Sequence, residues 1–317
     1  MSPVVLQVEN LTKRYGALMA VKNLSLTVDE GEVFGFLGPN GAGKTTSINM
    51  LCGLLKPDAG RVLIHGQSVT SGAVDVQVRV GVCPQNIVVW ERLTCLEQLQ
   101  FIGEMYGLSG TLARQRGTQL LEQLDLSEKR DRQARTLSGG MRRRLSLILA
   151  LVHDPAIVVL DEPEAGLDPQ SRIKVREFIR SLARHKTIIL TTHNMDEAER
   201  VADRIAIIDH GELLVLDTPE GLKRSVGEGD VLEITLNGQT GSGSVQQACE
   251  ELKQLTSGVS LDVAQGTLTV RALNVVNLLP PIMEVLAKSD LQCGEVRLRA
   301  NSLEDVFIQL TGRRLRE

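Results

Sequence analysis

Gly38-Pro39-Asn40-Gly41-Ala42-Gly43-Lys44-Thr45 decides the fold of this 317-residue chain, because the stretch fits the phosphate-binding loop. The apolar run Val33–Leu37 precedes it and a segment with helical spacing follows it, which is the context that the motif requires. Glycines let successive backbone N–H groups surround phosphate oxygens at the positive end of a helix dipole. Lys44 adds a mobile positive charge, and the Thr45 hydroxyl can bind Mg²⁺. The alternative is a glycine-rich turn that merely joins a strand to a helix.

Two adjacent acids end the apolar run Ile157-Val158-Val159-Leu160-Asp161-Glu162. Neighbours on a strand point to opposite sides, so the two carboxylates can do different work. We expect Asp161 to hold Mg²⁺ through water and Glu162 to polarise the attacking water as a general base. Two acids at a strand end also occur in solvated turns, but the phosphate-binding loop favours the functional interpretation.

A second glycine-rich stretch, Leu137-Ser138-Gly139-Gly140-Met141, precedes the acidic strand. Ser-Gly-Gly at a helix start exposes unpaired N–H groups and a hydroxyl, which can form a second anion site. One chain does not need two γ-phosphate cradles, whereas two copies that face each other head to tail would use both. The alternative is an ordinary helix cap.

In this order the three stretches resemble the ATP-binding-cassette (ABC) transporter ATPase family over about residues 4–224. The resemblance implies an α/β fold. Residues 1–224 would be a P-loop ABC ATPase domain, with a mixed-sheet core and a helical subdomain at about 93–152. A polar linker follows at about 225–230, and the alternation of strand and helix patterns beyond it predicts a small accessory α+β domain within residues 225–317.

The resemblance also assigns single residues to the site. Tyr15 is implied to stack on adenine, Gln85 to contact Mg²⁺ and sense the γ-phosphate, Asp168 to communicate across the dimer, and His193 to contact the γ-phosphate. Taken alone, Tyr15 is more typical of a core tyrosine and His193 of a structural histidine. The residues implied to contact ATP are Tyr15, Gly38, Pro39, Asn40, Gly41, Ala42, Gly43, Lys44, Thr45, Thr46, Gln85, Ser138, Gly139, Gly140 and Asp168. Those implied to bind Mg²⁺ are Thr45, Gln85 and Asp161, and those implied to be catalytic are Glu162 and His193.

Two further stretches are similar to the ATPases of ABC-2 type exporters, including the antibiotic-resistance branch. They are Met141-Arg142-Arg143-Arg144-Leu145 and Ser302–Arg313. The resemblance implies a homodimeric ATPase that uses ATP and Mg²⁺, lies on the cytoplasmic face of the cell membrane and drives a separate integral-membrane permease. For the three arginines the alternative is an exposed helix face, and without further basic clustering they do not favour DNA binding.

The chain departs from the family pattern at two places. Glu164 stands where a threonine is usual, and Leu145–Ala150 lacks the acid that often follows the arginines. A further carboxylate near Glu162 could slow hydrolysis, so a nucleotide-dependent regulatory switch is one alternative function. A non-transport ABC ATPase is another, although such proteins usually have two cassettes or a long coiled-coil insertion.

Composition excludes several classes. Lys plus Arg is 35 and Asp plus Glu is 39, which gives a net charge of −4 and disfavours nucleic acid as a partner. The longest nearly unbroken apolar run, Leu145–Val152, is far shorter than the roughly 18 residues of a membrane span, and no signal peptide is visible. We expect a soluble intracellular protein whose five cysteines are free thiols.

Two apolar groups outside the motifs are ambiguous. Trp90, Leu93, Phe101 and Tyr106 either form the core of the helical zone or, with Trp90 partly exposed, receive a short cytoplasmic helix of the permease. In the C-terminal domain the pattern predicts one sheet face covered by a helix stripe. The predicted face is Val231, Ile234, Leu268, Val270, Val296 and Leu298, and the stripe is Leu303, Val306, Phe307 and Leu310.

Overall fold

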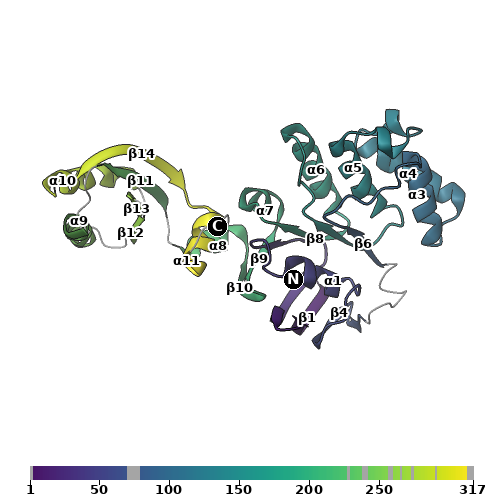
Figure 1. Cartoon of the computed structure of the whole chain (residues 1–317), viewed down its shortest axis with the longest axis horizontal. Helices are drawn as coiled ribbons and strands as arrows, with labels where there is room; N and C mark the ends of the chain where they lie inside the picture. Colours follow the sequence, from purple (N-terminus) through teal and green to yellow (C-terminus); the bar gives the residue numbers. More distant parts are fainter. Residues whose placement is uncertain are drawn as a thin grey trace. The chain divides into compact units, whose positions relative to one another are not determined.

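The computed structural model describes residues 3–69, 79–226, 229–237, 242–255, 260–264, 266–272, 275–289 and 291–312. The chain divides into two compact units, Met1–Pro219 and Glu220–Leu315 (Figure 1). Helix α8 (Pro219–Ser225) precedes the predicted linker and ends at Ser225, where that linker begins. Gly227 and Glu228, at the centre of that predicted linker, lie outside the described residues.

A six-stranded sheet forms the centre of the first unit, in the order β10-β9-β3-β8-β7-β6. Its five parallel strands follow closely the runs of apolar and β-branched residues from which the sequence predicts strands, and β10 is an antiparallel edge strand that was not predicted. The runs are Val33–Leu37, Val80–Cys83, Ala156–Leu160, Thr187–Leu190 and Ile205–Ile208. The strands are β3 (Val33–Leu37), β6 (Val80–Cys83), β7 (Ile157–Asp161), β8 (Thr187–Thr192), β9 (Arg204–Asp209) and β10 (Glu212–Asp217). Strands β3, β7 and β8 are buried at every position, as parallel strands covered on both faces must be.

An antiparallel sheet packs against this centre. Its order is β2-β1-β4-β5, with β1 (Val4–Tyr15), β2 (Leu18–Asp29), β4 (Ala59–Ile64) and β5 (Gln67–Ser68). A single apolar core joins both sheets and helix α1 (Lys44–Leu51), with Phe34 and Phe36 in edge-to-face contact at its centre. Figure 1 shows α1 and the antiparallel sheet on one side of the central sheet and α5, α6 and α7 on the other. The mixed-sheet prediction is confirmed.

Helices fill the zone from 95 to 149, close to the predicted helical subdomain. They are α3 (Cys95–Met105), α4 (Gly110–Gln123), the 3₁₀ turns η1 (Ser127–Lys129) and η2 (Ala134–Thr136), and α5 (Gly139–Leu149). The sequence Thr94-Cys95-Leu96-Glu97 has the pattern that predicts a capping box, and this box begins α3. Glu97 N donates to Thr94 Oγ1 at 3.2 Å, and Thr94 N donates to the Glu97 carboxylate at 2.7 Å. Two further helices, α6 (Pro169–Leu182) and α7 (Met195–Val201), follow β7 and β8.

The second unit is a four-stranded antiparallel sheet with helices. The sheet order is β12-β13-β11-β14, and β12 is a strand that the sequence analysis did not predict. The elements are β11 (Asp230–Asn237), α9 (Ser242–Leu255), β12 (Ser260–Ala264), β13 (Thr267–Ala272), η3 (Val275–Leu278), α10 (Leu279–Lys288), β14 (Gln292–Ala300) and α11 (Leu303–Thr311). The predicted α+β architecture is therefore present in this unit.

The predicted sheet face of this unit is partly wrong. Ile234 packs in a core with Leu232, Leu268 and Val270, together with residues of α9 and α10, whereas Val231 points to the opposite face because it lies an odd number of residues away. Val296 and Leu298 are 40 % and 53 % exposed because β14 is an edge strand. In the helix stripe, Leu303, Val306 and Phe307 are buried but Leu310 is exposed.

An ionic network joins helix α11 to the Val231 face of the sheet, where Arg271 and Arg299 are the cross-strand partners of Val231. The carboxylate of Asp305, which is 3 % exposed, accepts hydrogen bonds from Arg271 at 2.9 Å and from Arg299 at 2.6 and 2.8 Å. The Ser302 N–H and hydroxyl donate to the same group. Burial alone would raise the pKa of Asp305, but the hydrogen bonds from Arg299 and Ser302 and the charge of Arg299 hold it well below its usual range.

The Asp305 network predicts a pH-dependent stability of the second unit. Because the folded-state pKa of Asp305 is depressed, its stabilisation is fully present above the unfolded pKa of about 4 and is lost as the pH falls below that value. Asp305→Asn should lower the free energy of unfolding by about 2 kcal/mol at pH 7, because it removes the carboxylate that Arg271 and Arg299 share, and among the described residues only Arg299 keeps a second acidic partner, Glu233.

Calorimetric unfolding at pH 7 and pH 3 measures this effect. Glu295→Gln is the control, because Glu295 forms an exposed pair with Arg297 on β14 that contributes little. Equal unfolding temperatures for Asp305→Asn and the wild type at pH 7 would show that the network does not stabilise this unit.

Candidate active site at the phosphate-binding loop and the end of β7

The phosphate-binding loop joins β3 to α1, as predicted. Gly41 and Gly43 have φ angles of 82° and 99°, in the left-handed region that favours glycine. A Cβ atom on Gly43 would lie 2.4 Å from the carbonyl oxygen of Ala20, so no other residue fits there without a shift of the main chain. The loop therefore has the backbone conformation that glycine alone permits.

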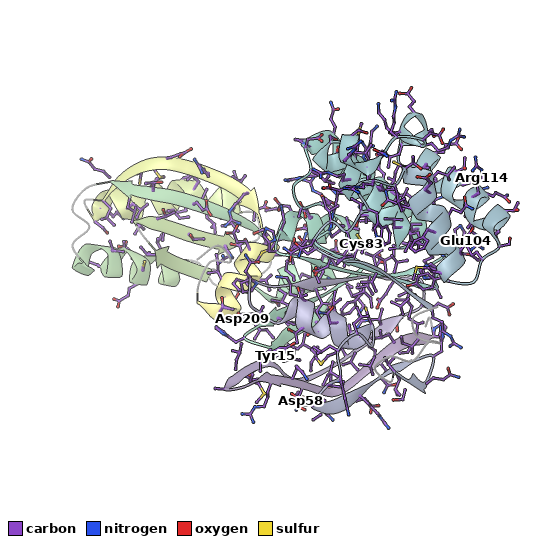
Figure 2. All side chains as sticks on the ribbon, turned by 45° about the vertical axis from the view of Figure 1, so that its right-hand side comes forward. Tyr15, Asp58, Cys83, Glu104, Arg114 and Asp209 are labelled. Atoms are coloured by element: carbon purple, nitrogen blue, oxygen red, sulfur yellow. The ribbon has the colours of Figure 1, made fainter. Side chains whose placement is uncertain are left out.

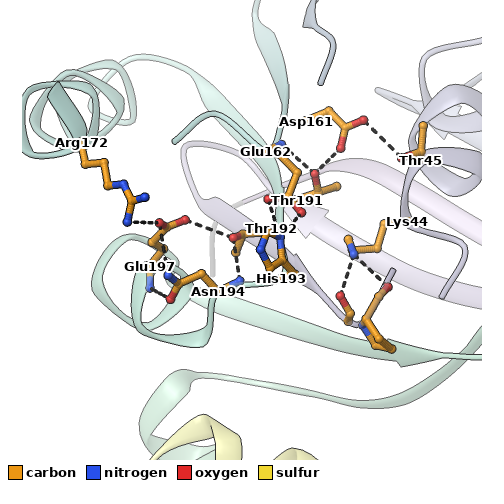
Figure 3. A network of polar contacts seen from close by, with 12 residues as sticks. Lys44, Thr45, Asp161, Glu162, Arg172, Thr191, Thr192, His193, Asn194 and Glu197 are labelled. Atoms are coloured by element: carbon orange, nitrogen blue, oxygen red, sulfur yellow. Dashed lines mark hydrogen bonds and ion pairs between the residues drawn. The ribbon is translucent and has the colours of Figure 1, made fainter. Parts of the chain in front are cut away.

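The Lys44 side chain folds back over this loop. Its Nζ donates to the carbonyl oxygens of Gly38 at 2.6 Å and Pro39 at 3.0 Å (Figure 3). Burial lowers the pKa of Lys44, and the charges of Glu162 and Asp161 oppose that effect. The ammonium group is thus held at the loop, where it can exchange carbonyl oxygens for phosphate oxygens.

Asp161 ends β7 beside the start of α1. Thr45 Oγ1 donates to its carboxylate at 3.3 Å, and the Thr191 hydroxyl of β8 donates to the other carboxylate oxygen. A hydroxyl, a carboxylate and the Gln85 amide, which lines the same cavity, offer only the oxygen ligands that Mg²⁺ prefers. No group of three or more His, Cys, Asp or Glu side chains able to hold a metal gathers in the described part of the chain. Mg²⁺ commonly completes its coordination with water and substrate phosphates, so these residues fit it.

Glu162 follows Asp161 in a strained backbone conformation. Its φ angle is 51°, in a region that costs a non-glycine residue about 1–2 kcal/mol. The Glu162 N–H donates to the hydroxyl of Thr191 at 3.0 Å, and the buried carboxylate lies 2.9 Å from His193 Nδ1 through both of its oxygens. His193 itself follows β8 and has a half-exposed side chain. The two predicted catalytic residues are therefore in direct contact (Figure 3).

A cavity of about 720 Å³ brings most of the predicted ATP-contact residues together. Tyr15, which ends β1 and is labelled in Figure 2, lines it with half of its surface exposed, so it is not a core tyrosine. The predicted residues in the lining are Tyr15, Pro39, Asn40, Gly41, Gly43, Lys44, Thr45, Thr46, Gln85, Asp161 and Glu162. Gly38 and Ala42 are not part of the lining but belong to the same loop, and the carbonyl of Gly38 accepts from Lys44.

The remaining predicted residues lie away from this cavity. Ser138 caps α5 by accepting a hydrogen bond from Met141 N, and Asp168 caps α6 by accepting from Ser171 N. The two caps are neighbours, because a Cβ atom on Gly140 would lie 3.8 Å from the Asp168 carboxylate. Ser138, Gly139, Gly140 and Asp168 therefore form a second cluster in the same chain, apart from the phosphate-binding loop.

Glu164, the residue that departs from the family pattern, is paired. Its buried carboxylate accepts hydrogen bonds from Arg176 of α6 at 2.9 and 3.3 Å. Burial raises the pKa of the neighbouring Glu197, and the negative charge of Glu164 adds to that rise. The extra carboxylate thus has a guanidinium partner of its own and does not stand as a free charge beside Glu162.

Sequence reasoning missed three residues at or beside this site. Thr191 binds both acids at the end of β7, His210 lines the cavity, and Arg143 is buried against the same strand end. A hydroxyl at the end of the apolar run 187–190 was an available signal for Thr191. Nothing in the sequence distinguishes His210, and the arginine run was interpreted as a possible exposed helix face, which is wrong for the buried Arg143 and Arg144.

Known proteins resemble the chain over its whole length. The sequence model of the family described as ABC transporter matches residues 21–165. The daunorubicin resistance ATP-binding protein DrrA2 of Streptomyces coeruleorubidus is 38% identical over 99% of this chain and 97% of its own length. The linearmycin resistance ATP-binding protein LnrL of Bacillus subtilis is 34% identical over 99% of this chain and 100% of its own. The Nod factor export ATP-binding protein I of Ralstonia nicotianae is 38% identical over 100% and 96%.

Solved structures agree with this assignment. An ATP-binding subunit of an ABC transporter superposes with a TM-score of 0.64 at 29% identity, covering 70% of this chain and 92% of that one. A dimeric ATP-binding cassette in a post-hydrolysis state with ADP and phosphate superposes with a TM-score of 0.62 at 27% identity, covering 67% and 98%. The loop and the acidic strand end line one cavity, and His193 contacts Glu162 at its edge; with the relatives above, the chain belongs to the ABC transporter family of ATP-binding subunits and is an ATPase.

Proposed function

We propose that this chain is the ATP-hydrolysing subunit of an ABC-2 type exporter, acting on a separate integral-membrane permease from the cytoplasmic face of the cell membrane. The contact of Glu162 with His193 beside the phosphate-binding loop carries the proposal. The names of full-length relatives, which describe drug resistance and Nod factor export, support the export direction. No helix in the described ranges is both long and apolar enough to cross a membrane.

In this proposal Glu162 is the general base and His193 orients it. The proton on His193 Nδ1 holds the Glu162 carboxylate, which accepts a proton from water as the water oxygen bonds to the γ-phosphorus and ADP leaves. Lys44 and the loop N–H groups receive the phosphate charge, and Tyr15 stacks on adenine. Mg²⁺, held by Thr45, Asp161 and Gln85, would neutralise charge on the β- and γ-phosphates.

A homodimer completes the site in the same proposal. Ser138, Gly139, Gly140 and Asp168 lie away from the cavity of their own chain, so a second copy, placed head to tail, would bring its cluster to the bound ATP. The N–H groups at the start of α5 would then face the γ-phosphate. The dimeric cassette with ADP and phosphate, a structural neighbour, supports this arrangement.

A second cavity, of about 380 Å³, is the proposed permease site. It lies between segment 80–90, the end of α1 and the helical zone, and most of its lining is apolar. Trp90 is 40 % exposed at this cavity and stands edge to face with the exposed Phe101 at 5.6 Å. The alternative that Trp90, Leu93, Phe101 and Tyr106 form a closed helical core is therefore wrong. A short apolar helix of the permease fits such a groove.

The regulatory switch is less well supported as a second function. Its one supporting feature was Glu164, whose carboxylate is bound by Arg176. With that charge paired, no contact among the described residues of the site favours slow hydrolysis over turnover.

Glu162→Gln should bind ATP but lose hydrolysis. The amide cannot accept the proton of the attacking water, so kcat should fall by about 100-fold or more while the Kd for ATP stays within about threefold. Because the closed dimer does not reach products, it should accumulate with ATP in sedimentation experiments. Glu104→Gln, on the exposed surface of α3, is the control and should behave as the wild type. Hydrolysis by Glu162→Gln at the wild-type rate would contradict the assignment.

Trp90→Ala should weaken the attachment to the permease more than ATP binding. A tryptophan at the centre of a groove typically contributes about 2 kcal/mol or more, which is about a 30-fold loss of affinity. The amount of chain recovered with the host membrane fraction, at matched expression, measures attachment, and ATP binding is measured on purified protein. Met105→Ala is the control, because Met105 is an exposed apolar side chain at the end of α3 that does not line the cavity. Parallel losses of attachment and ATP binding would argue that Trp90 is needed only for folding.

A further inference from the structure

Arg143, on α5, is the largest fully buried side chain of the described residues, with 1 % of its surface exposed. Its guanidinium has five N–H donors, and each one donates to a different main-chain carbonyl oxygen. Nε donates to Pro163 at 3.3 Å, Nη1 to Pro84 at 2.7 Å and Gln85 at 2.9 Å, and Nη2 to Asp161 and Glu162 at 2.6 Å each. No donor of this side chain is left for another partner.

Arg143 forms no ion pair with a carboxylate among the described residues, and main-chain carbonyl oxygens accept all of its hydrogen bonds. Burying an ion in this way is costly unless every donor is satisfied, so the full set of bonds fixes the surrounding main chain closely. Arg144, the next residue of α5, is also buried but donates only to Leu124 of the helical zone, and its Nε has no partner. The two neighbouring arginines thus offer a matched comparison.

The five carbonyls belong to two segments that enter the ATP cavity. Segment 84–85 follows β6 and carries Gln85, and segment 161–163 begins at the last residue of β7 and carries both acids. The parallel pairing of β6 with β7 ends at Cys83 and Leu160. Beyond that point the two segments are joined by the hydrogen bonds of Arg143, which also connect both segments to α5. Helix α5 is the one that begins at the Ser138-Gly139-Gly140 cluster.

Glu162 depends most on this connection. Its φ of 51° is a conformation that glutamate rarely adopts, so the surrounding structure must hold it. Thr191 binds the N–H of Glu162, and Arg143 binds its carbonyl oxygen. The main chain of the proposed general base is therefore held on both sides, by β8 and by α5.

We propose that Arg143 is a positioning residue for ATP hydrolysis, which holds the main chain of Glu162 in place against segment 84–85 and links it to α5. It touches neither the nucleotide cavity nor the reacting atoms, and it acts through the main chain. The proposal rests on the role of Glu162 given above, and the test separates the two.

The test compares Arg143→Lys with Arg144→Gln in the full chain. Lysine keeps the charge but has three donors on one nitrogen, so it cannot reach all five carbonyls. Arg143→Lys should lower kcat by about 10-fold or more with the Kd for ATP within about threefold, since the loop and adenine contacts are unchanged. Arg144→Gln should lower the unfolding temperature and leave kcat near the wild-type value. The Arg143→Lys and Arg144→Gln proteins are both measured well below their unfolding temperatures. Arg143→Gln is a second variant at position 143.

Coupling to Glu162 distinguishes positioning from general destabilisation. If Arg143 acts through Glu162, Arg143→Lys should change the residual rate of Glu162→Gln by less than about twofold, because the group that it positions is already gone. The same fold loss of rate in both backgrounds, a wild-type kcat for Arg143→Lys, or an equal kcat loss for Arg144→Gln would each overturn the proposal. Wild-type hydrolysis by Glu162→Gln would instead refute the role of Glu162 and, with it, this route of action.

Discussion

Hydrogen bonds to the main chain just beyond β7 are the constraint on which the site depends. Two neighbouring acids must point in different directions there, and the second must keep a left-handed backbone. Thr191 of β8 satisfies the Glu162 N–H and also binds Asp161, while Arg143 of α5 holds the carbonyls that follow. Because these partners come from a strand and a helix far apart in sequence, the geometry of the acids exists only when the whole cassette has folded.

Segment 84–90 connects the two cavities of the first unit. Gln85 lines the nucleotide cavity, and Pro84, Val88 and Trp90 line the second one. A movement of Gln85 would therefore displace chain that also borders the proposed permease groove. Arg143 binds the carbonyls of Pro84 and Gln85, so it connects this segment to the end of β7 and to α5. Such shared elements allow a bound ligand to bias a two-state equilibrium.

The second unit has its own core, and its chemistry is of a different kind. Its sheet packs α9 and α10 on one face, while the Asp305 network with Arg271 and Arg299 fastens α11 to the other. The described interactions of this unit stabilise its fold. The cavity of about 720 Å³ is lined only by residues of the first unit. A small unit with helices on both faces of a four-stranded sheet needs such polar anchors, because its apolar core is limited.

The sequence alone determined the parallel strands, the phosphate-binding loop, the acidic pair and the cap of α3, because each depends on local patterns of apolar residues, glycines or capping side chains. It did not reveal β10 and β12, the face of Val231 or the exposure of Leu298, which depend on neighbouring strands and on strand order. The burial of Arg143 is the clearest case. The sequence of an arginine run is the same whether its side chains lie on a solvent-exposed helix face or in a core. Only the tertiary structure supplies the five carbonyl oxygens that make the burial of Arg143 possible.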